Sequence, residues 1–492
     1  MLSGCRFSIS GTCLMAWGGR SVAASDRHLL IERNPGEWRL AVLDDGRLDD
    51  LVIERDHEPS GIGDILLGRV RSVLPGIKAA FIDTGQGPDG FLPQQDARWL
   101  NPEKPDAAIN TLVREGQSLL LQVQRDAEST KGPRLTADIG LGGRFLVLRP
   151  RGSAVQLSRK ITADETRTRL QNSLTELAGS RGWIVRTEAA TADPDEIMLE
   201  AEGLIRKWQD IESRSDKLKA PALLDSPNKG LAGCLQRLGL AGVTRITVDR
   251  DATAAALNEL RLIPHIPVDI CRASAGPLET EGAAEQIEVL TGPEAALPGG
   301  GLIRIERTAA ATTIDVDTAA ASGNSTAPAR HAVNEAAARE IPRQLRLRNI
   351  GGVILIDFIL DRDRKPGDCI IATLKAGFRT DPEQPHITGL TPSGLVEVIR
   401  RRSGPTLAER LTTSGPASPS PVTMALDALK TLLRQVRADP SFRPALRAGR
   451  QIIDLYRGEL SDALQETERA LQFPLPLSVD DTLGGRIEID QT

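Results

Sequence analysis

The chain has 492 residues, of which 40% are hydrophobic and 26% are charged, and its formal net charge is −5. This composition is typical of a globular protein with several domains and excludes a wholly disordered chain. The charge neither supports nor excludes nucleic-acid binding, which depends on local basic patches. The longest apolar stretch, Gly351–Leu360, contains Asp357 and is too short to span a membrane, so we expect no membrane association.

Residues 1–28 fit the rest of the chain poorly. Their apolar stretch is short and interrupted, so we interpret them as a disordered extension or a misassigned start, with a signal peptide as the less favoured alternative. The five cysteines are scattered, and none has the spacing of a metal site. They indicate reduced thiols in a cytoplasmic protein.

Short strands separated by glycine-containing turns dominate the first third of the chain. They are predicted at residues 30–32, 38–43, 48–54, 65–70, 79–83, 90–92 and 117–124. The later strands suit a small β-barrel of the OB type. The pattern leaves open whether Phe81 and Phe91 stack on RNA bases or, as is more common, fill the barrel core.

Helices become prominent after this region. Apolar residues near a period of 3.6 predict helices at 163–177 and 195–218, with strands at 146–148 and 183–186. A segment rich in Pro, Asp and Ser at 221–229 is a candidate domain boundary.

Strands and helices alternate in the second half, which predicts an α/β or α+β sandwich. Strands are predicted at 302–306, 311–317 and 353–360, and helices at 332–348 and within 389–402. Residues 403–422 are rich in Ser, Pro, Thr and Gly and are predicted to form a linker. Helical periodicity at 424–436 and 449–472 indicates a small terminal domain.

Three aspartates in this half could bind a metal ion. Asp315 and Asp317 are two residues apart on a predicted strand and so share a face, and Asp357 lies in an apolar strand where an unpaired carboxylate is costly. If the strands are neighbours, the carboxylates converge on a site suited to Mg²⁺, with Mn²⁺ as an alternative. The spacing alone favours the alternative that they end strands or pair with Arg304 or Arg307.

Two groups of basic residues could contact RNA. Arg339, Arg343 and Arg346 share one face of a predicted helix and could hold phosphates, although a solvated face is the more common outcome. Arg186 and Thr187 follow a strand and offer a guanidinium and a hydroxyl group to a terminal phosphate.

Six stretches, taken in order, resemble the ribonuclease E/G family over nearly all of residues 29–492. They are GRVRSVLPGIKAAFID at 68–83, TKGPRLTADIGLGGRFLVLRP at 130–150, GWIVRT at 182–187, ATTIDVDT at 311–318, RQLRLRNIGGVILIDFI at 343–359 and SGLVEVIRRR at 393–402. The resemblance implies a Mg²⁺-dependent endoribonuclease that acts in rRNA or tRNA processing or in mRNA decay. It implies cleavage of single-stranded, A/U-rich RNA with a preference for a 5′-monophosphate, giving 5′-phosphate products.

The resemblance also implies a multidomain α+β fold. The expected parts are an RNase H-like subdomain in two pieces (29–57 and 236–293), an inserted S1-type OB barrel (58–137) and 5′-sensor (138–235), a DNase I-like catalytic subdomain (294–402), a linker (403–422) and a small domain (423–492).

The resemblance assigns roles by position. It implies that Asp315 and Asp357 bind the metal ion and that Asp317 assists catalysis. The expected 5′-phosphate ligands are Arg186, Thr187, Val147 and Gly143, and the expected RNA contacts are Phe81, Phe91, Lys131, Arg343 and Arg346.

Three features depart from the family pattern. Asp317 stands where the family usually has Asn and adds negative charge beside an anionic substrate. The C-P-x-C segment that binds a shared zinc ion in many relatives is absent, so we expect no zinc and, if a homodimer forms, no zinc link. Pro342 replaces a helical Ala, and residues 360–386 are short and divergent. These departures keep open the alternative of a catalytically weak or inactive RNA-binding regulatory relative.

Overall fold

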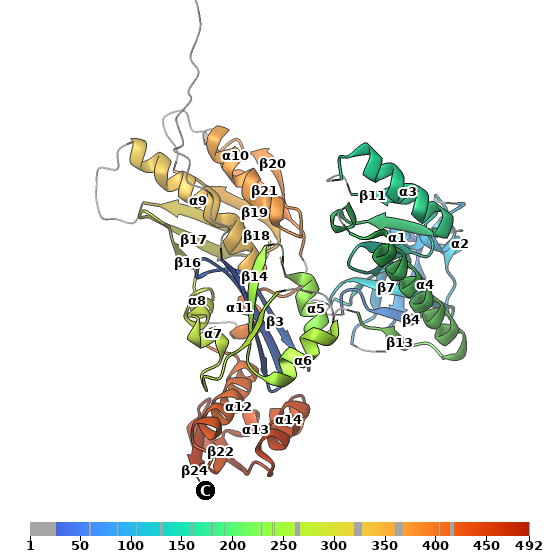
Figure 1. Ribbon diagram of the computed structural model, residues 1–492. Coiled ribbons are helices and arrows are strands. Elements are labelled where there is room, and N and C mark those ends of the chain that lie inside the picture. The colour runs from blue at the N-terminus through green and yellow to red at the C-terminus, as the bar shows by residue number, and fades with distance from the viewer. Residues whose placement is uncertain are drawn as a thin grey trace, which may run out of the picture.

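The computed structural model describes residues 26–491 apart from several short segments (Figure 1). The residues outside the description are 1–25, 59–60, 86, 105, 128–130, 159–160, 179–180, 191, 228, 239, 241, 261–265, 319–326, 360–367, 403, 414–417 and 492. The predicted amino-terminal extension therefore lies outside the described residues up to position 25. Its last two residues, Arg27 and His28, already belong to the first strand.

The central sheet joins two distant parts of the sequence and has the strand order β15-β14-β1-β2-β3. Its strands are β1 (Arg27–Asn34), β2 (Glu37–Asp44), β3 (Arg47–Arg55), β14 (Val243–Val248) and β15 (Val268–Ile270). Alternate residues of β1 enter different cores, with Leu29 and Ile31 on one face and Leu30 on the other. The helices beside it are α5 (Gly230–Arg237), α6 (Asp251–Leu260), α7 (Pro277–Thr280) and α8 (Ala283–Val289). The strands predicted at 30–32, 38–43 and 48–54 are confirmed, and they form two antiparallel hairpins.

A closed barrel follows the central hairpins. Its order is β4-β5-β6-β8-β7, and β4 closes the barrel by pairing also with β7. The strands are β4 (Ile65–Leu74), β5 (Ala79–Asp83), β6 (Gly90–Pro93), β7 (Ser118–Arg125) and β8 (Arg134–Thr136), with short helices α1 (Gln94–Ala97) and α2 (Ile109–Leu112). Such a barrel fits the expected S1-type OB fold. The candidate boundary at 221–229 contains β13 (Ala222–Asp225), which extends the barrel sheet beside β4.

A small sheet with two long helices packs next to the barrel. Its order is β11-β12-β10-β9. The elements are β9 (Leu141–Gly142), β10 (Leu146–Arg149), β11 (Val155–Leu157), β12 (Gly182–Val185), α3 (Asp164–Ala178) and α4 (Pro194–Lys217). Trp183 and Trp208 fill its core, and both predicted helices are confirmed.

A mixed sheet, here called the β16–β21 sheet, follows in the order β16-β17-β18-β19-β21-β20. Its elements are β16 (Glu294–Ala296), β17 (Leu302–Arg307), β18 (Ala311–Asp317), β19 (Gly352–Asp357), β20 (His386–Leu390), β21 (Val396–Arg400), α9 (Ala327–Leu347) and α10 (Asp368–Gly377). Helices α9 and α10 cover one face, and the other face is open (Figure 1). Helix α9 continues through Pro342, which packs against Gly377 of α10.

The prediction of a helix within residues 389–402 was wrong. This segment forms the end of β20 and the whole of β21. Val396, Val398 and Arg400 are buried at alternate positions, which is the period of a strand. The buried guanidinium of Arg400 pairs with Asp381 at 2.8 Å, so a charged residue stands where a strand pattern would show an apolar one.

The predicted linker contains ordered structure. Helix α11 (Leu407–Leu411) begins with a capping box in which Thr406 and Glu409 exchange hydrogen bonds. The terminal domain has the predicted helices and an unforeseen sheet. Its elements are α12 (Pro421–Ala438), α13 (Arg450–Arg457), α14 (Ser461–Leu471), β22 (Pro444–Ala448), β23 (Leu477–Val479) and β24 (Ile487–Gln491).

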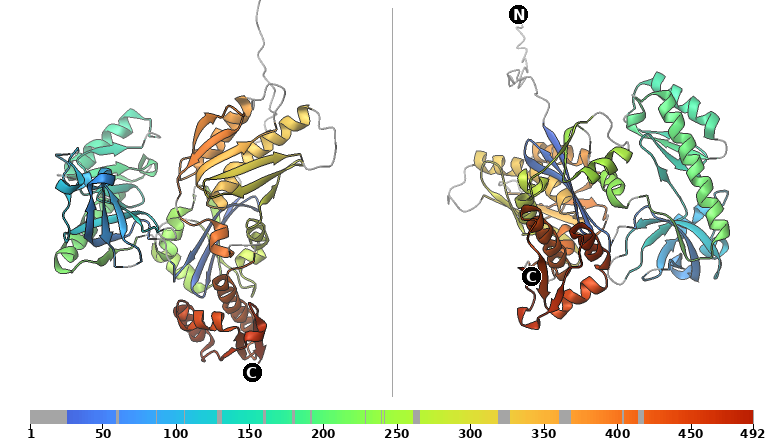
Figure 2. Two further views of the ribbon diagram at one scale, coloured as in Figure 1. Left: turned by 180° about the vertical axis from the view of Figure 1, so that it is seen from behind. Right: turned by 60° about the horizontal axis from the view of Figure 1, so that its bottom comes forward.

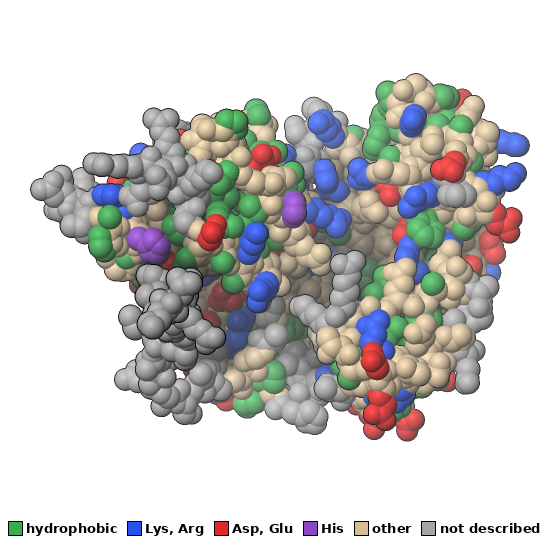
Figure 3. Space-filling view, turned by 90° about the horizontal axis from the view of Figure 1, so that it is seen from above, with side chains coloured by type: hydrophobic (Ala, Val, Ile, Leu, Met, Phe, Trp, Pro, Cys, Tyr) green, Lys and Arg blue, Asp and Glu red, His purple; other side chains and the backbone are tan. Residues whose placement is uncertain are grey.

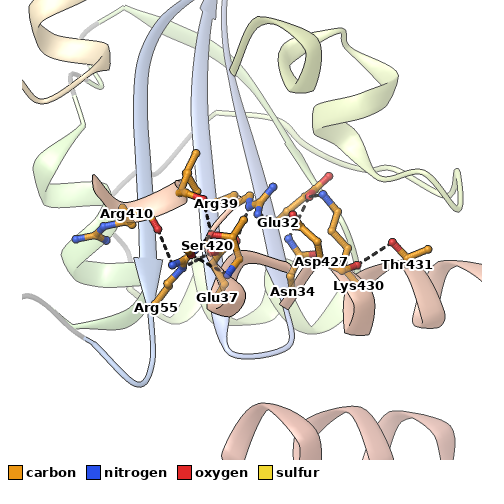
Figure 4. Close-up of polar contacts among 12 residues, drawn as sticks. Glu32, Asn34, Glu37, Arg39, Arg55, Arg410, Ser420, Asp427, Lys430 and Thr431 are labelled. Carbon is orange, nitrogen blue, oxygen red and sulfur yellow. Dashed lines mark hydrogen bonds and ion pairs between the residues drawn. The ribbon is translucent and has the colours of Figure 1, made fainter. Parts of the chain in front are cut away.

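Buried ion pairs join the terminal domain to the central sheet (Figure 4). Glu37 of β2 is 1% exposed and lies between Arg39 and Arg55. Arg39 also pairs with Asp427 of α12 at 3.0 Å. Burial alone would raise the pKa of Glu37, but the two guanidinium groups outweigh it and lower the pKa to about 2.

The molecule has two halves (Figure 2). One half contains the barrel and the small sheet with α3 and α4. The other contains the β16–β21 sheet and the central sheet, with the terminal domain at the far end. Within the described ranges, no helix has the length and apolar character needed to cross a membrane.

Candidate active site

Asp315 and Asp357 lie side by side on two neighbouring parallel strands. The register of β18 with β19 places Asp315 opposite Asp357. Ile314 and Val316 enter the core beneath α9, so Asp315 and Asp317 point to the open face. Asp357 ends β19 on the same face, and all three carboxylates are exposed. The fold therefore brings the aspartates of the metal hypothesis together.

The bases that could neutralise these aspartates have other partners. Arg304 lies opposite Asp315 in β17, yet its guanidinium pairs with Glu294 at 2.7 Å. Arg307 pairs with Glu409 at 2.6 Å. In the part of the chain that the structure describes, no ion pair joins any of the three aspartates to a basic side chain. This geometry does not support the alternative that they are salt-bridged strand ends.

The facing carboxylates also influence each other electrostatically. Partial burial and the charge of Asp315 together raise the pKa of Asp357 above its usual value. A divalent cation would offset this repulsion. Mg²⁺ usually takes one or two protein carboxylates together with waters and a substrate phosphate. The pair therefore fits Mg²⁺, although the described residues hold no cluster of three or more His, Cys, Asp or Glu side chains arranged for a metal ion.

Asn334 of α9 holds the chain just beyond Asp357. Its side-chain amide donates from Nδ2 to the carbonyl oxygen of Ile359 at 2.8 Å and accepts from the Ile359 N–H at 3.0 Å. The side chain is 4% exposed. Because Ile359 is two residues after Asp357, this pair of hydrogen bonds fixes the path of the chain as it leaves the aspartate. The sequence analysis missed Asn334, since one Asn within a helical pattern carries no local signal.

The expected 5′-phosphate ligands gather around the hairpin that joins β9 to β10. Gly143 lies in its turn, and Val147 of β10 pairs with Gly142. The Arg186 N–H donates to the carbonyl oxygen of Phe145 at 2.8 Å, and its exposed guanidinium lies against Gly142. Thr187 follows Arg186, and its hydroxyl is 2.9 Å from that of Ser158. The guanidinium of Arg186 thus lies beside the turn, and the neighbouring residue Thr187 contributes a hydroxyl group that pairs with Ser158.

The barrel aromatics lie outside the barrel core. Phe81 and Phe91 face each other across β5 and β6, with ring centroids 5.9 Å apart in an edge-to-face arrangement. Both rings are partly exposed and do not belong to the buried core, which uses Ala80 and Ile82 of the same strand. The more common alternative, core packing, therefore does not apply. Lys131 is exposed in the segment that leads to β8.

Arg343 and Arg346 of α9 face strand β3. Arg343 pairs with Glu340 at 2.7 Å and donates to the carbonyl oxygen of Leu48. Arg346 pairs with Asp49 at 2.8 Å. The helical spacing put both residues on one face, but it could not reveal that β3 covers that face. Both residues therefore bridge α9 and the central sheet, and their expected contact with RNA stays a prediction.

Basic side chains lie near the space between the two halves. The hairpin that joins β9 to β10 is called the sensor hairpin below, after its expected role. Viewed from above, Lys and Arg gather beside a hollow between the β16–β21 sheet and the half that carries this hairpin (Figure 3). A cleft of about 860 Å³ also separates the barrel from one end of the β16–β21 sheet. It is lined by Asp64, Leu66 and Thr84 of the barrel side and by Arg307, Arg402 and Arg410 of the other. The basic surface in Figure 3 is compatible with RNA despite the net negative charge, whereas the cleft itself is also lined by Asp64, Asp126 and Glu409.

Comparisons with known proteins agree with this arrangement. The model of the Ribonuclease E/G family matches residues 140–403. The chain is 31% identical over 463 residues to Ribonuclease G of Salmonella typhimurium, covering 89% of this chain and 94% of that protein. The chain belongs to the ribonuclease E/G family.

Other relatives of this ribonuclease E/G family member differ in length. Ribonuclease E of Nostoc sp. is 36% identical over 390 residues, which cover 77% of this chain and 56% of that protein. Ribonuclease E of Synechocystis sp. is 35% identical over 375 residues, which cover 74% and 55%. The chain thus matches about half the length of these two proteins.

Proposed function

We propose that the chain is a Mg²⁺-dependent endoribonuclease that hydrolyses single-stranded, A/U-rich RNA and leaves 5′-phosphate and 3′-hydroxyl ends. The register that sets Asp315 beside Asp357 on an open sheet face carries this proposal. Membership of the ribonuclease E/G family supports a role in RNA cleavage.

Each aspartate has a distinct task in this proposal. Asp315 and Asp357 hold the ion, and Asp317 lies two residues beyond Asp315 on the same face, where it orients the ion or a water molecule. Bound Mg²⁺ supplies positive charge beside the phosphate and makes a water molecule easier to deprotonate. Asn334 keeps Asp357 directed at the open face through Ile359.

Substrate recognition is assigned to the other half of the molecule. Phe81 and Phe91 offer partly exposed rings on which RNA bases stack, and Lys131 neutralises a nearby phosphate. Arg186 and Thr187 bind a 5′-monophosphate, which favours substrates that carry one. The substrates are RNAs in rRNA or tRNA processing or in mRNA decay.

The test uses labelled A/U-rich oligoribonucleotides with a 5′-monophosphate or a 5′-hydroxyl group, incubated with Mg²⁺ or EDTA. We expect Mg²⁺-dependent cleavage, faster on the monophosphate. Asp357→Ala should abolish cleavage and keep RNA affinity, whereas Glu288→Ala, which removes an exposed carboxylate of α8, should leave cleavage unchanged. RNA binding without cleavage by the unmodified protein would instead identify a binding protein.

A further inference from the structure

Helix α4 inserts one carboxylate behind the turn of the sensor hairpin. Glu200 accepts hydrogen bonds from the backbone N–H groups of Arg144, Phe145 and Leu146, each at 2.8 Å. Ile197, Ala201 and Leu204 of the same helix are buried, so Glu200 is held against the hairpin by the core around it. An anion within a group of backbone N–H donors is strongly favoured.

The turn is shaped around this carboxylate. The Gly143 N–H donates to the carbonyl oxygen of Leu146 at 2.7 Å, which closes the turn on itself. A Cβ atom at Gly143 would overlap the carboxylate of Glu200. A side chain at position 143 would therefore have to displace the Glu200 carboxylate, which would remove its hydrogen bonds to the turn.

The same turn supports Arg186. The carbonyl oxygen of Phe145 accepts the Arg186 N–H at 2.8 Å, and the Phe145 N–H is bonded to Glu200 at 2.8 Å. The guanidinium of Arg186 lies against Gly142, the residue before Gly143. The backbone of Phe145 thus connects the Glu200 carboxylate of α4 to Arg186, the residue assigned to the 5′-phosphate.

We propose that Glu200 is a positioning residue for 5′-phosphate recognition, which holds the hairpin turn in the form that presents Arg186. The inference rests on the proposed preference for a 5′-monophosphate. Glu200 itself does not contact the phosphate, because its charge repels one and its oxygens are occupied by the turn. Its loss lowers discrimination between RNA ends and leaves the aspartates of the β16–β21 sheet untouched.

The experiment compares kcat/KM for 5′-monophosphate and 5′-hydroxyl RNA in wild type, Arg186→Ala, Glu200→Ala and Glu200→Gln. We expect Glu200→Ala to bring the ratio to within about twofold of the Arg186→Ala value. Glu200→Gln should give an intermediate ratio, because its amide nitrogen cannot accept a backbone N–H. Glu202→Ala, which removes an exposed carboxylate from the same helix, should keep the wild-type ratio.

The ratio separates positioning from general stability, because a merely destabilised protein loses activity on both substrates equally. A wild-type ratio in Glu200→Ala, or equal losses on both RNAs, would overturn the inference. If Glu200→Ala does not fold, Glu200→Gln and Gly143→Ala are measured instead. A wild-type ratio in both of these variants would also overturn the inference. If Arg186→Ala keeps the preference, the proposed sensor fails; if only Arg186→Ala loses it, the role of Glu200 alone fails.

Discussion

Asp357→Asn should make the region around the active site more stable and the protein inactive. Neighbouring strands are about 4.8 Å apart, and charges at that distance repel by about 0.9 kcal/mol in water and about 3.5 kcal/mol at an effective dielectric constant of 20. Asp315 and Asp357 are exposed and in register, so solvent screening favours the lower value. Removing one charge should therefore stabilise β18 and β19 by about 1 kcal/mol in EDTA.

Cleavage should respond in the opposite direction. Losing one of the two carboxylates proposed to bind the metal ion should lower kcat by about 100-fold or more, since metal catalysis contributes several kcal/mol. Hydrogen–deuterium exchange of β18 and β19 measures their local stability, which suits a chain with several domains better than global unfolding. Mg²⁺ should slow exchange in the wild type and have less effect in the variant. Faster exchange of Asp357→Asn in EDTA, or wild-type cleavage, would refute the reasoning.

Three further changes test other parts of the structure. Glu37→Gln should destabilise the contact between β2 and α12 by about 3 kcal/mol because it leaves Arg39 and Arg55 without their buried partner. Hydrogen–deuterium exchange of these two elements measures this. The pKa of Glu37 falls from 4.5 to about 2 on folding, so its contribution to stability is complete above pH 4.5 and is lost as the pH falls towards 2. The difference in stability between wild type and variant should therefore disappear in that pH range. A difference that stays constant would contradict the ion pairs of Glu37. Asn334→Ala should raise the Mg²⁺ concentration that gives half-maximal cleavage. Asn334→Leu should raise this concentration at least as much, because only an amide can form both hydrogen bonds to Ile359. Phe91→Ala should weaken RNA binding by about 1–3 kcal/mol, measured by fluorescence anisotropy, and an unchanged Kd would exclude stacking on this ring.

The sequence was informative where a local period decides the structure. Ile314 and Val316 alternate with aspartates, so the strand and its two faces could be read directly, and the register of β18 with β19 agrees with the predicted neighbours. Helices α3 and α4 have charged outer faces and apolar inner ones, and both were predicted close to their observed bounds. In each case, the alternation of apolar and polar residues within one helix or strand was enough to predict that element and its buried face.

The sequence failed where a distant partner decides the outcome. Arg400 is charged yet buried, because Asp381 lies beside it, and this obscured the strand pattern of β21. Arg343 and Arg346 form a basic helix face, but strand β3 from the other end of the sequence covers it. Neither partner can be recognised from the residues around the arginines.

The residues that support the two proposed sites belong to this second class. Asn334 and Glu200 both project from helices and bond to the backbone of a neighbouring segment, and each satisfies peptide groups next to a residue with a proposed role. In a helical pattern, such a side chain is indistinguishable from a solvated polar residue. Such a side chain is identified only by the backbone groups to which it forms hydrogen bonds, and tertiary packing decides which groups these are. The motifs of this chain therefore indicate which groups act on RNA, whereas the fold indicates which groups hold them in place.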